Sequence, residues 1–434
     1  MSVQPHELFN FTETSDACIK CGKCIPVCTI HNINPDEVTS PRGFIDLLGA
    51  YQRGQLELDF NAKEIFESCF LCTNCTDVCP KALATDMVIE QVRADIAEKF
   101  GIAWFKRAFF FLLRHRFTMD ILFKLGYVFQ TCGFKIKAEL NSMEPRFNLP
   151  IIKKDRLLPS MGKTSFLNTY PENISNGGKR RVAIFIGCLG NYNYTQIGDG
   201  LVEILEELKI DVFIPKKQLC CGAPAYFTGD FATVDHNAKK NIEYFESFID
   251  EVEAIIIPEA TCSAMIKIDY DHYFHDQPQW RERANKLKDK IFMATEWLEK
   301  HTDLKAVLAT KSQSDLSVTY HDPCHARKMQ GIHQEPRALI AQNYVIKEMS
   351  DPNACCGFGG VTMQTEKFYF AQAAGKPKAA MIAQSGGQIV SAECSACRMQ
   401  INNSMHEANV NVVFKNPIEL IAQALKGKND NTRG

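Results

Sequence analysis

The sequence lacks several features that would assign it to a familiar functional class. No apolar run approaches the ~18–20 residues that a membrane span needs, and the N-terminal stretch MSVQPHELFNFTETSDAC contains no apolar segment of a signal peptide. Gly198-Asp199-Gly200 has no third glycine at the spacing of a dinucleotide-binding loop. The net charge of −2 gives no reason to expect a nucleic acid partner. These absences argue against integral membrane proteins, secreted proteins, nicotinamide enzymes and nucleic-acid-binding proteins.

Cysteine, in contrast, is abundant, with 18 in 434 residues. The cysteines occur in groups at metal-ligand spacing and are not scattered as a disulfide framework. Thiolates that bind metal must stay reduced, so we expect a cytoplasmic protein. The chain length predicts two or three domains with ample material for a core.

Two short runs near the N-terminus share the spacing Cys-x2-Cys-x2-Cys-x3-Cys, which is the ferredoxin spacing for a [4Fe–4S] cluster. In two-cluster ferredoxins the fourth cysteine of each run binds the other cluster. We therefore expect one cluster on Cys18, Cys21, Cys24 and Cys79. We expect the other on Cys69, Cys72, Cys75 and Cys28. Two structural zinc sites are the alternative, since four thiolates also suit zinc.

The chain up to residue 180 divides by composition. Residues 1–100 form the two-cluster unit, with helical apolar spacing predicted at 41–55 and 84–100. Residues 133–180 are rich in proline and glycine and predict an extended linker. At the other end of the chain, the polar tail 427–434 is expected to be disordered.

The segment 101–132 between the two-cluster unit and the linker is both aromatic and basic. Basic residues interrupt every apolar run within residues 104–131. One interpretation is a pair of amphipathic helices on a membrane surface or against a membrane-bound partner. The other is a core helix whose long basic side chains reach solvent.

From residue 179 onwards, strands alternate with helices, an order typical of a parallel α/β sheet. Cysteines follow the strand ends, where such folds bind ligands. The order Cys, Cys-Cys-Gly, Cys occurs twice, and the offsets agree: 188 to 324 is 136, 221 to 356 is 135, and 262 to 397 is 135. The chain is thus predicted to contain an internal duplication, with a first repeat at 181–310 and a second at 311–426.

The two repeats differ in their cysteines. The second has five, namely Cys324, Cys355, Cys356, Cys394 and Cys397. Adjacent cysteines can hold two different irons of an extended cluster, so this set suggests an iron–sulfur site of unusual shape. The first repeat has four, namely Cys188, Cys220, Cys221 and Cys262, with Glu259 at the position of Cys394. A four-thiolate cluster, a zinc ion, a variant with Glu259 as a ligand and an empty site all remain open there.

Two ferredoxin runs followed by two CCG repeats resemble the iron–sulfur subunits of membrane-linked dehydrogenases. These include the iron–sulfur subunits of glycolate oxidase and of anaerobic glycerol-3-phosphate dehydrogenase, and lactate-utilisation proteins. The sequence PRG at 41–43 is similar to the glycolate oxidase type, and GCLGNYN (187–193) and YHDPCH (320–325) are similar to both dehydrogenase subunits. The repeats also resemble those of heterodisulfide reductase, which hold non-cubane [4Fe–4S] clusters. The resemblance implies such a cluster on the five cysteines of the second repeat.

The expected fold is therefore α+β and multi-domain, with a helical two-cluster ferredoxin domain followed by a duplicated α/β CCG domain with parallel strands. Clusters without flavin or nicotinamide motifs indicate a subunit that carries electrons. The resemblance implies a respiratory 2-hydroxy-acid dehydrogenase of the glycolate oxidase type, with an FAD-containing dehydrogenase subunit as partner and quinone or a membrane-bound protein as acceptor. We expect it on the inner face of the cell membrane as a peripheral protein.

Two alternatives to this function remain open. One is a subunit like that of anaerobic glycerol-3-phosphate dehydrogenase, and the other is a catalytic subunit, like heterodisulfide reductase, that reduces a disulfide at the second CCG site. A zinc-stabilised docking role for the first repeat is compatible with the electron-transfer subunit.

Overall fold

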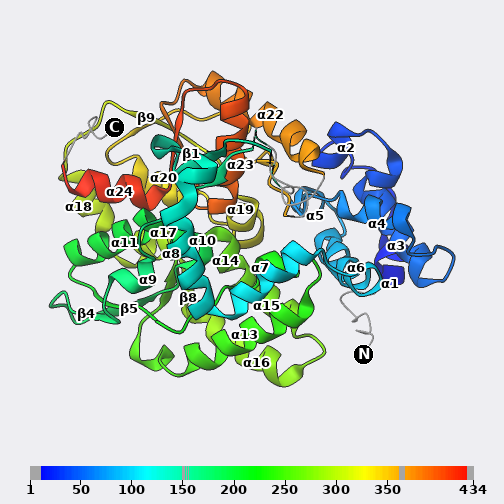
Figure 1. Ribbon diagram of the computed structural model, residues 1–434, viewed down its shortest axis with the longest axis horizontal. Coiled ribbons are helices and arrows are strands. Elements are labelled where there is room, and N and C mark those ends of the chain that lie inside the picture. The colour runs from blue at the N-terminus through cyan, green and yellow to red at the C-terminus, as the bar shows by residue number, and fades with distance from the viewer. Residues whose placement is uncertain (1–10, 149–151, 153, 155, 361–366, 428–434) are drawn as a thin grey trace.

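The N-terminal part of the chain is a helical unit at one side of the molecule, blue in Figure 1. The computed structural model describes residues 11–148, 152, 154, 156–360 and 367–427, so the predicted disorder of 428–434 lies outside the described residues. The unit contains α1 (Phe11–Ala17), α2 (Thr29–Ile33), η2 (Glu37–Thr39), α3 (Pro41–Gln52), α4 (Phe60–Glu67), α5 (Asn74–Asp77) and α6 (Thr85–Phe100). The predicted helices correspond to α3 and α6.

Local sequence determines where the longer helices of this unit begin. Ser40 precedes α3 and accepts a hydrogen bond from the Gly43 amide at 3.0 Å, and Asp59 caps α4 through the Ala62 amide at 2.8 Å. Such caps satisfy amides that have no partner within the helix. The apolar sides of α3 and α6 are then buried in one core, which leaves the two cysteine runs in the loops around them.

Two helices, α7 (Trp104–Arg114) and α8 (Arg116–Gly133), form a hairpin over the first repeat. Their inner side buries Phe110, Leu113 and Met119. The outer side leaves large apolar side chains in solvent, including Phe117 at 78% exposure and Phe129 at 62%. The segment therefore has one face buried in the core and one apolar face in solvent, and contact with a membrane stays a prediction. Within the described residues, no helix is both long and apolar enough to cross a membrane.

Short elements of structure occur within residues 133–180, where the composition predicts an extended linker. They are β1 (Phe134–Lys137), η3 (Ala138–Leu140), β2 (Ser142–Pro145), β3 (Leu158–Pro159), α9 (Phe166–Thr169) and β4 (Asn173–Ile174). The first three strands form an antiparallel sheet. The Asn403 side chain bonds both the amide and the carbonyl of Leu157, at 2.8 and 3.3 Å, which fixes this segment against the second repeat.

The first repeat is built on a five-stranded sheet of order β4-β6-β5-β7-β8. Its strands β5 (Arg181–Ile184), β6 (Asp211–Phe213), β7 (Ile255–Ile257) and β8 (Ile291–Met293) are parallel, and β4 is antiparallel to β6. Its helical elements are α10 (Gly187–Tyr192), α11 (Thr195–Glu207), α12 (Ala223–Tyr226), α13 (Phe231–Glu246), η4 (Ile249–Glu251), α14 (Ala260–Ala264), η5 (Met265–Asp269), α15 (Tyr270–Tyr273), α16 (Pro278–Leu287), η6 (Lys288–Lys290), α17 (Ala294–His301) and α18 (Leu304–Ala309).

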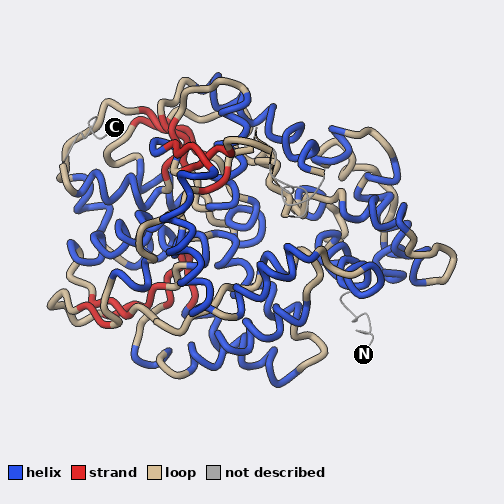
Figure 2. The backbone as a smooth tube through the Cα atoms, in the orientation of Figure 1, coloured by secondary structure: helices blue, strands red, loops and turns tan. Residues whose placement is uncertain are grey.

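The second repeat has a smaller, fully parallel sheet of order β10-β9-β11-β12. Its strands are β9 (Ser317–Tyr320), β10 (Val345–Ile346), β11 (Ile389–Ser391) and β12 (Val413–Lys415). Its helices are α19 (Cys324–Gln330), α20 (Gln334–Ile340), α22 (Phe368–Ser385), α23 (Ser395–Glu407) and α24 (Pro417–Leu425). The parallel sheets confirm the predicted fold class, and Figure 2 shows the strands gathered away from the all-helical N-terminal side.

The N-terminal unit packs against both repeats. Helix α2 contacts α22, and α5 contacts α19. On the other side, a Cβ at Gly229 would lie 2.2 Å from the carbonyl oxygen of Arg93, so only glycine allows α6 to approach the first repeat this closely. This packing brings the ferredoxin loops to the strand ends of the repeats.

Candidate metal centres

One predicted ligand set of the ferredoxin unit is assembled in the interior. The thiols of Cys28, Cys69, Cys72 and Cys75 face one another, and the residues line a common pocket. Burial raises the pKa of Cys28 and of Cys69 to about 12. Cys28 comes from the first run and the other three from the second, which is the grouping that the crossed assignment requires. The assignment itself stays a prediction.

The other set lies nearer the surface. Cys18, Cys21 and Cys24 are close enough for their charges to interact, and Cys21 is exposed to solvent. Cys79 lies between α5 and α6, where its amide bonds the carbonyl of Thr76 at 3.2 Å. The ferredoxin unit therefore has one largely buried cysteine set and one more exposed set.

In the second repeat, the three strand-end segments bring the predicted cysteines together. Cys356 and Cys397 have their sulfurs 3.3 Å apart, and the Cys397 amide points at Cys394 Sγ at 3.4 Å. Hydrogen bonds from Cys355 and Cys397 lower the pKa of Cys356 to about 5. Burial raises the pKa of Cys324 to about 12.

Lys378 and His321 lie close to Cys356 in this second set. The buried ammonium of Lys378 donates to the carbonyl of Asp351 at 2.8 Å. Burial lowers the pKa of Lys378 to about 8, while Cys356 and other thiols act in the opposite direction. His321, Cys356 and Cys397 place one ligand atom each within 4.8 Å of one another. Burial and Lys378 hold the pKa of His321 well below its usual value.

The buried ferredoxin set and the second repeat meet directly. The thiol of Cys72 interacts with that of Cys355, and this contact together with burial holds the pKa of Cys72 well above its usual value. Lys328 on α19 donates to the carbonyl of Cys72 at 3.1 Å and also bonds Asn74 Oδ1. Two predicted sites that lie far apart in the sequence are therefore neighbours, and the spacing of the cysteines contained no signal for it.

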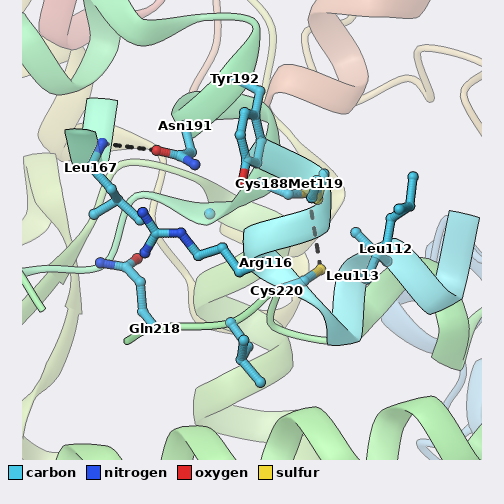
Figure 3. A pocket seen from close by; sticks show the side chains of 12 residues that line it. Leu112, Leu113, Arg116, Met119, Leu167, Cys188, Asn191, Tyr192, Gln218 and Cys220 are labelled. Carbon is cyan, nitrogen blue, oxygen red and sulfur yellow. Dashed lines mark hydrogen bonds between the residues drawn. The ribbon is translucent and has the colours of Figure 1, made fainter. Parts of the chain in front are cut away.

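The first repeat gathers Cys188, Cys220, Cys221 and Cys262 beneath the α7–α8 hairpin. Cys188 and Cys220 have their sulfurs 3.9 Å apart, and Cys221 contacts both Cys220 and Cys262. Figure 3 shows the sulfurs of Cys188 and Cys220 facing a pocket that Leu112, Leu113 and Met119 cover from the hairpin. The neighbouring thiols and burial raise the pKa of Cys188 well above its usual value.

The donor sets suit metal. Crowded, buried thiols are expensive to ionise alone, and a bound cation removes that cost. Gly187 has no side chain, and a Cβ at this position would lie 2.8 Å from Cys262 Sγ. The glycine therefore keeps the space beside this sulfur open. Each repeat therefore fits a thiolate-bound metal or iron–sulfur cluster. All 18 cysteines lie among the described residues, and none of them forms a disulfide.

Glu259, predicted as a tentative ligand, lies at the boundary between the repeats. Its carboxylate accepts hydrogen bonds from the Ser395 amide, at 2.8 Å, and from the Ser395 hydroxyl. Burial raises its pKa to about 7, and the Ser395 hydrogen bonds oppose that shift. Thr261 makes a second contact between the two repeats, because its hydroxyl lies 3.5 Å from Cys394 Sγ. The hydrogen bonds of Glu259 to Ser395 thus join the segments of the two cysteine sets, and these bonds require no metal.

A mostly apolar cavity of about 170 Å³ lies beside the first set. Cys188, Cys221 and Cys262 contribute to its wall, together with Phe109 from α7. Phe227, Phe358 and Met399 are also among the residues that line it. The cavity is large enough to admit part of an organic molecule next to the thiols.

Comparison with known proteins finds three regions of the chain that match domain families. Residues 14–83 match the family of 4Fe-4S dicluster domains, and residues 182–267 and 318–402 each match the cysteine-rich domain family CCG. A probable glycolate oxidase iron-sulfur subunit of Bacillus subtilis is 30% identical over 358 residues, which cover 79% of each chain. The chain belongs to the family of glycolate oxidase iron–sulfur subunits.

Further relatives of this glycolate oxidase-type subunit include an iron-sulfur protein and a lactate utilization protein. An uncharacterized iron-sulfur protein of Methanococcus maripaludis is 29% identical over 395 residues, 89% of this chain and 67% of the relative. Lactate utilization protein A of Bacillus subtilis is 29% identical over 247 residues, 56% of this chain and 98% of the relative. The predicted resemblance is confirmed, and the matched domains support iron–sulfur clusters as cofactors of the glycolate oxidase-type subunit.

Proposed function

We propose that this chain is the electron-transfer subunit of a respiratory 2-hydroxy-acid dehydrogenase, most like glycolate oxidase, and that it passes electrons from an FAD-containing partner toward quinone. The observation that supports this most is the contact between Cys72 and Cys355, because it brings a predicted ligand of the ferredoxin unit next to a predicted ligand of the second repeat. Iron–sulfur clusters bound at these sites would supply one-electron carriers whose potentials the surrounding protein sets.

The order of the sites follows from their exposure and contacts. Cys21, in the outermost set, faces solvent and offers a docking point for a flavoprotein. The buried set around Cys72 comes next, followed by the second repeat. Thr261 and Cys394 then connect the second repeat to the first at 3.5 Å. The first repeat is therefore the exit end of the proposed series.

The apolar cavity at this exit end supports quinone as the acceptor. A quinone head group is flat and largely apolar, and the cavity offers aromatic side chains opposite thiols. One of these side chains, Phe109, belongs to α7, so the cavity adjoins the helical hairpin.

The outer face of the hairpin is the proposed membrane contact. Phe117, Val128 and Phe129 are at least 60% exposed on α8. Residues 104–137 contain seven lysines and arginines, of which Lys106 is buried, and only one acidic residue, Asp120, whose carboxylate accepts from the Tyr192 hydroxyl at 2.6 Å. A cationic surface with exposed aromatic and aliphatic side chains suits an anionic lipid surface. We place the protein peripherally on the inner face of the cell membrane.

The proposal is tested by purifying the tagged full-length chain anaerobically and identifying the bound partner and its flavin. The complex is then assayed for quinone reduction with glycolate, lactate and glycerol 3-phosphate as separate donors. Quinone reduction by a 2-hydroxy acid, dependent on this chain, supports the proposal. Reduction by glycerol 3-phosphate alone, or the lack of any stable flavin subunit, contradicts it.

The same preparation distinguishes a disulfide-reducing enzyme from an electron carrier. A chemical electron donor and a series of disulfide substrates are supplied to the isolated chain. Turnover of a disulfide without the partner would favour catalysis at the second repeat over the electron-transfer role.

A further inference from the structure

His321 lies at the end of the central strand of the second repeat, three residues before Cys324. Its amide continues the sheet by donating to the carbonyl of Ser391 at 2.9 Å, which fixes the backbone. Its side chain is 1% exposed. The imidazole is therefore held inside the cysteine-rich site and cannot turn into solvent.

One ring nitrogen of His321 has a defined partner. Nδ1 lies 3.1 Å from the carbonyl oxygen of Pro352. A carbonyl oxygen can only accept, so Nδ1 carries a proton and donates it, and Nε2 is the nitrogen left for another partner. The same carbonyl also accepts from the Asp322 amide at 3.0 Å, which fixes its position.

The other nitrogen has no such partner. Nε2 is buried and has no hydrogen-bond partner among the described residues, although a buried polar atom without a partner is costly. His321 also places a ring nitrogen within 4.8 Å of the sulfurs of Cys356 and Cys397. A metal ion held by these thiolates would supply the partner that Nε2 lacks.

We propose that His321 Nε2 is a direct ligand of the metal centre in the second repeat, beside the thiolates of Cys356 and Cys397. A ring whose second nitrogen donates to a backbone carbonyl is the usual arrangement of a metal-binding histidine. This role rests on the metal site within the proposed function, and it does not depend on the organic substrate or the acceptor.

The first repeat provides an internal contrast. By the offset of 136 that relates Cys188 to Cys324, the position of His321 corresponds to Phe185, a buried apolar residue. A nitrogen ligand is therefore expected in the second repeat and not at this position of the first. The difference would give the two centres different potentials, since ligand type is one of the factors that set them.

The test uses full-length protein, purified anaerobically and labelled with ¹⁵N only in histidine. Metal analysis comes first. If the second repeat holds iron, pulsed EPR of its paramagnetic state should show a ¹⁵N coupling that is lost in His321→Gln. If it holds zinc, X-ray absorption should show one nitrogen at about 2.0–2.1 Å that is lost in the same variant.

His325→Gln is the matched control, because His325 Nδ1 lies 3.3 Å from Cys324 Sγ and should keep the signal unchanged. His321→Cys supplies a thiolate ligand and should retain the metal while losing the nitrogen signal, which guards against a variant that does not fold. A nitrogen signal that persists in both His321 variants, a wild-type centre without nitrogen, or a second repeat without metal overturns the proposal. Failure of quinone reduction with the nitrogen signal intact would overturn only the proposed function.

Discussion

Lys328 of the second repeat donates from Nζ to the carbonyl oxygen of Cys72 in the ferredoxin unit at 3.1 Å, across 256 positions of sequence. The same ammonium bonds Asn74 and lies 3.4 Å from the carbonyl of Asn353. One side chain thus joins the loop of a predicted ferredoxin ligand to the loop that precedes Cys355. The distance over which electrons would pass between the two sites depends on this junction.

Replacing Lys328 should weaken the junction. A hydrogen bond from a charged group contributes ~1.5–3 kcal/mol, so Lys328→Met is expected to lower the free energy of unfolding by about this amount and, by loosening the junction, to slow electron transfer from the ferredoxin unit to the second repeat. Iron content should not change. Stopped-flow spectroscopy after reduction of the ferredoxin unit measures the rate. Lys426→Met, which removes an exposed pair with Glu203, is the control. Equal rates in both variants would rule out this role of Lys328.

The crossed ligation of the two ferredoxin clusters can be tested by pairs of substitutions. Cys28→Ser and Cys75→Ser lie in different runs but in the same spatial group. Each should remove about four irons and the same EPR signal, and the double variant should remove no more. Cys132→Ser, at an exposed position on α8, should lose no iron. Two different lost signals would show that each run binds its own cluster.

Glu259→Gln separates a structural role from a metal-binding role. Because both carboxylate oxygens bond Ser395, the substitution is expected to lower the free energy of unfolding by ~1–3 kcal/mol. Metal in the first repeat should remain. Metal analysis and denaturant unfolding measure the two effects, with Cys262→Ser as the variant that should lose metal. Loss of metal in Glu259→Gln at unchanged stability would indicate that the carboxylate is a ligand.

Asp269 should make stability depend on pH. It is 4% exposed on η5 and faces Glu90 and Asp86 of α6 and His325 of α19. Burial raises the pKa of Asp269 to about 7. A carboxyl whose pKa is raised on folding binds its proton more tightly in the folded state. The contribution of Asp269 to the free energy of unfolding is therefore greatest below the unfolded pKa of about 4 and falls as the pH rises toward 7.

Asp269→Asn cannot ionise, so its melting temperature should exceed that of the wild type by a few degrees at pH 8 and by much less at pH 5. Asp271→Asn is a control for which the opposite change in melting temperature is expected. Burial opposes ionisation of Asp271, but hydrogen bonds from Arg281 and Asn285 hold its pKa at about 2. Its loss should lower the melting temperature at both pH values. If the melting temperature changed by the same amount between pH 5 and pH 8 in the wild type and in Asp269→Asn, the assignment would be contradicted.

The outer face of α8 predicts lipid binding. Phe117→Asp combined with Val128→Asp places charge on this face and should reduce sedimentation with phosphatidylglycerol vesicles by about tenfold. Raised salt should weaken wild-type binding, because part of the attraction is electrostatic. Val345→Asp, at an exposed apolar position on β10, should bind as the wild type does. Undiminished vesicle binding by the double variant would favour a protein partner for this face.

The sequence alone predicted those features that depend on the spacing of residues close together in the chain. The Cys-x2-Cys-x2-Cys-x3-Cys runs and the two CCG repeats identify thiolate sites, because ligands a few residues apart in a loop reach one metal whatever the rest of the chain does. Alternation of apolar strands with helices likewise indicated parallel sheets, which β5 to β8 and β9 to β12 confirm. The family followed from the same motifs.

Tertiary structure alone decided how these sites relate to one another. The contact of Cys72 with Cys355, the bond of Glu259 to Ser395 and the orientation of the His321 ring join residues from distant segments, and no periodicity encodes such pairs. The α7–α8 segment shows the same limit. Its composition fitted both a core helix and a surface helix, and packing against the first repeat determined which face was buried and which apolar side chains stayed exposed.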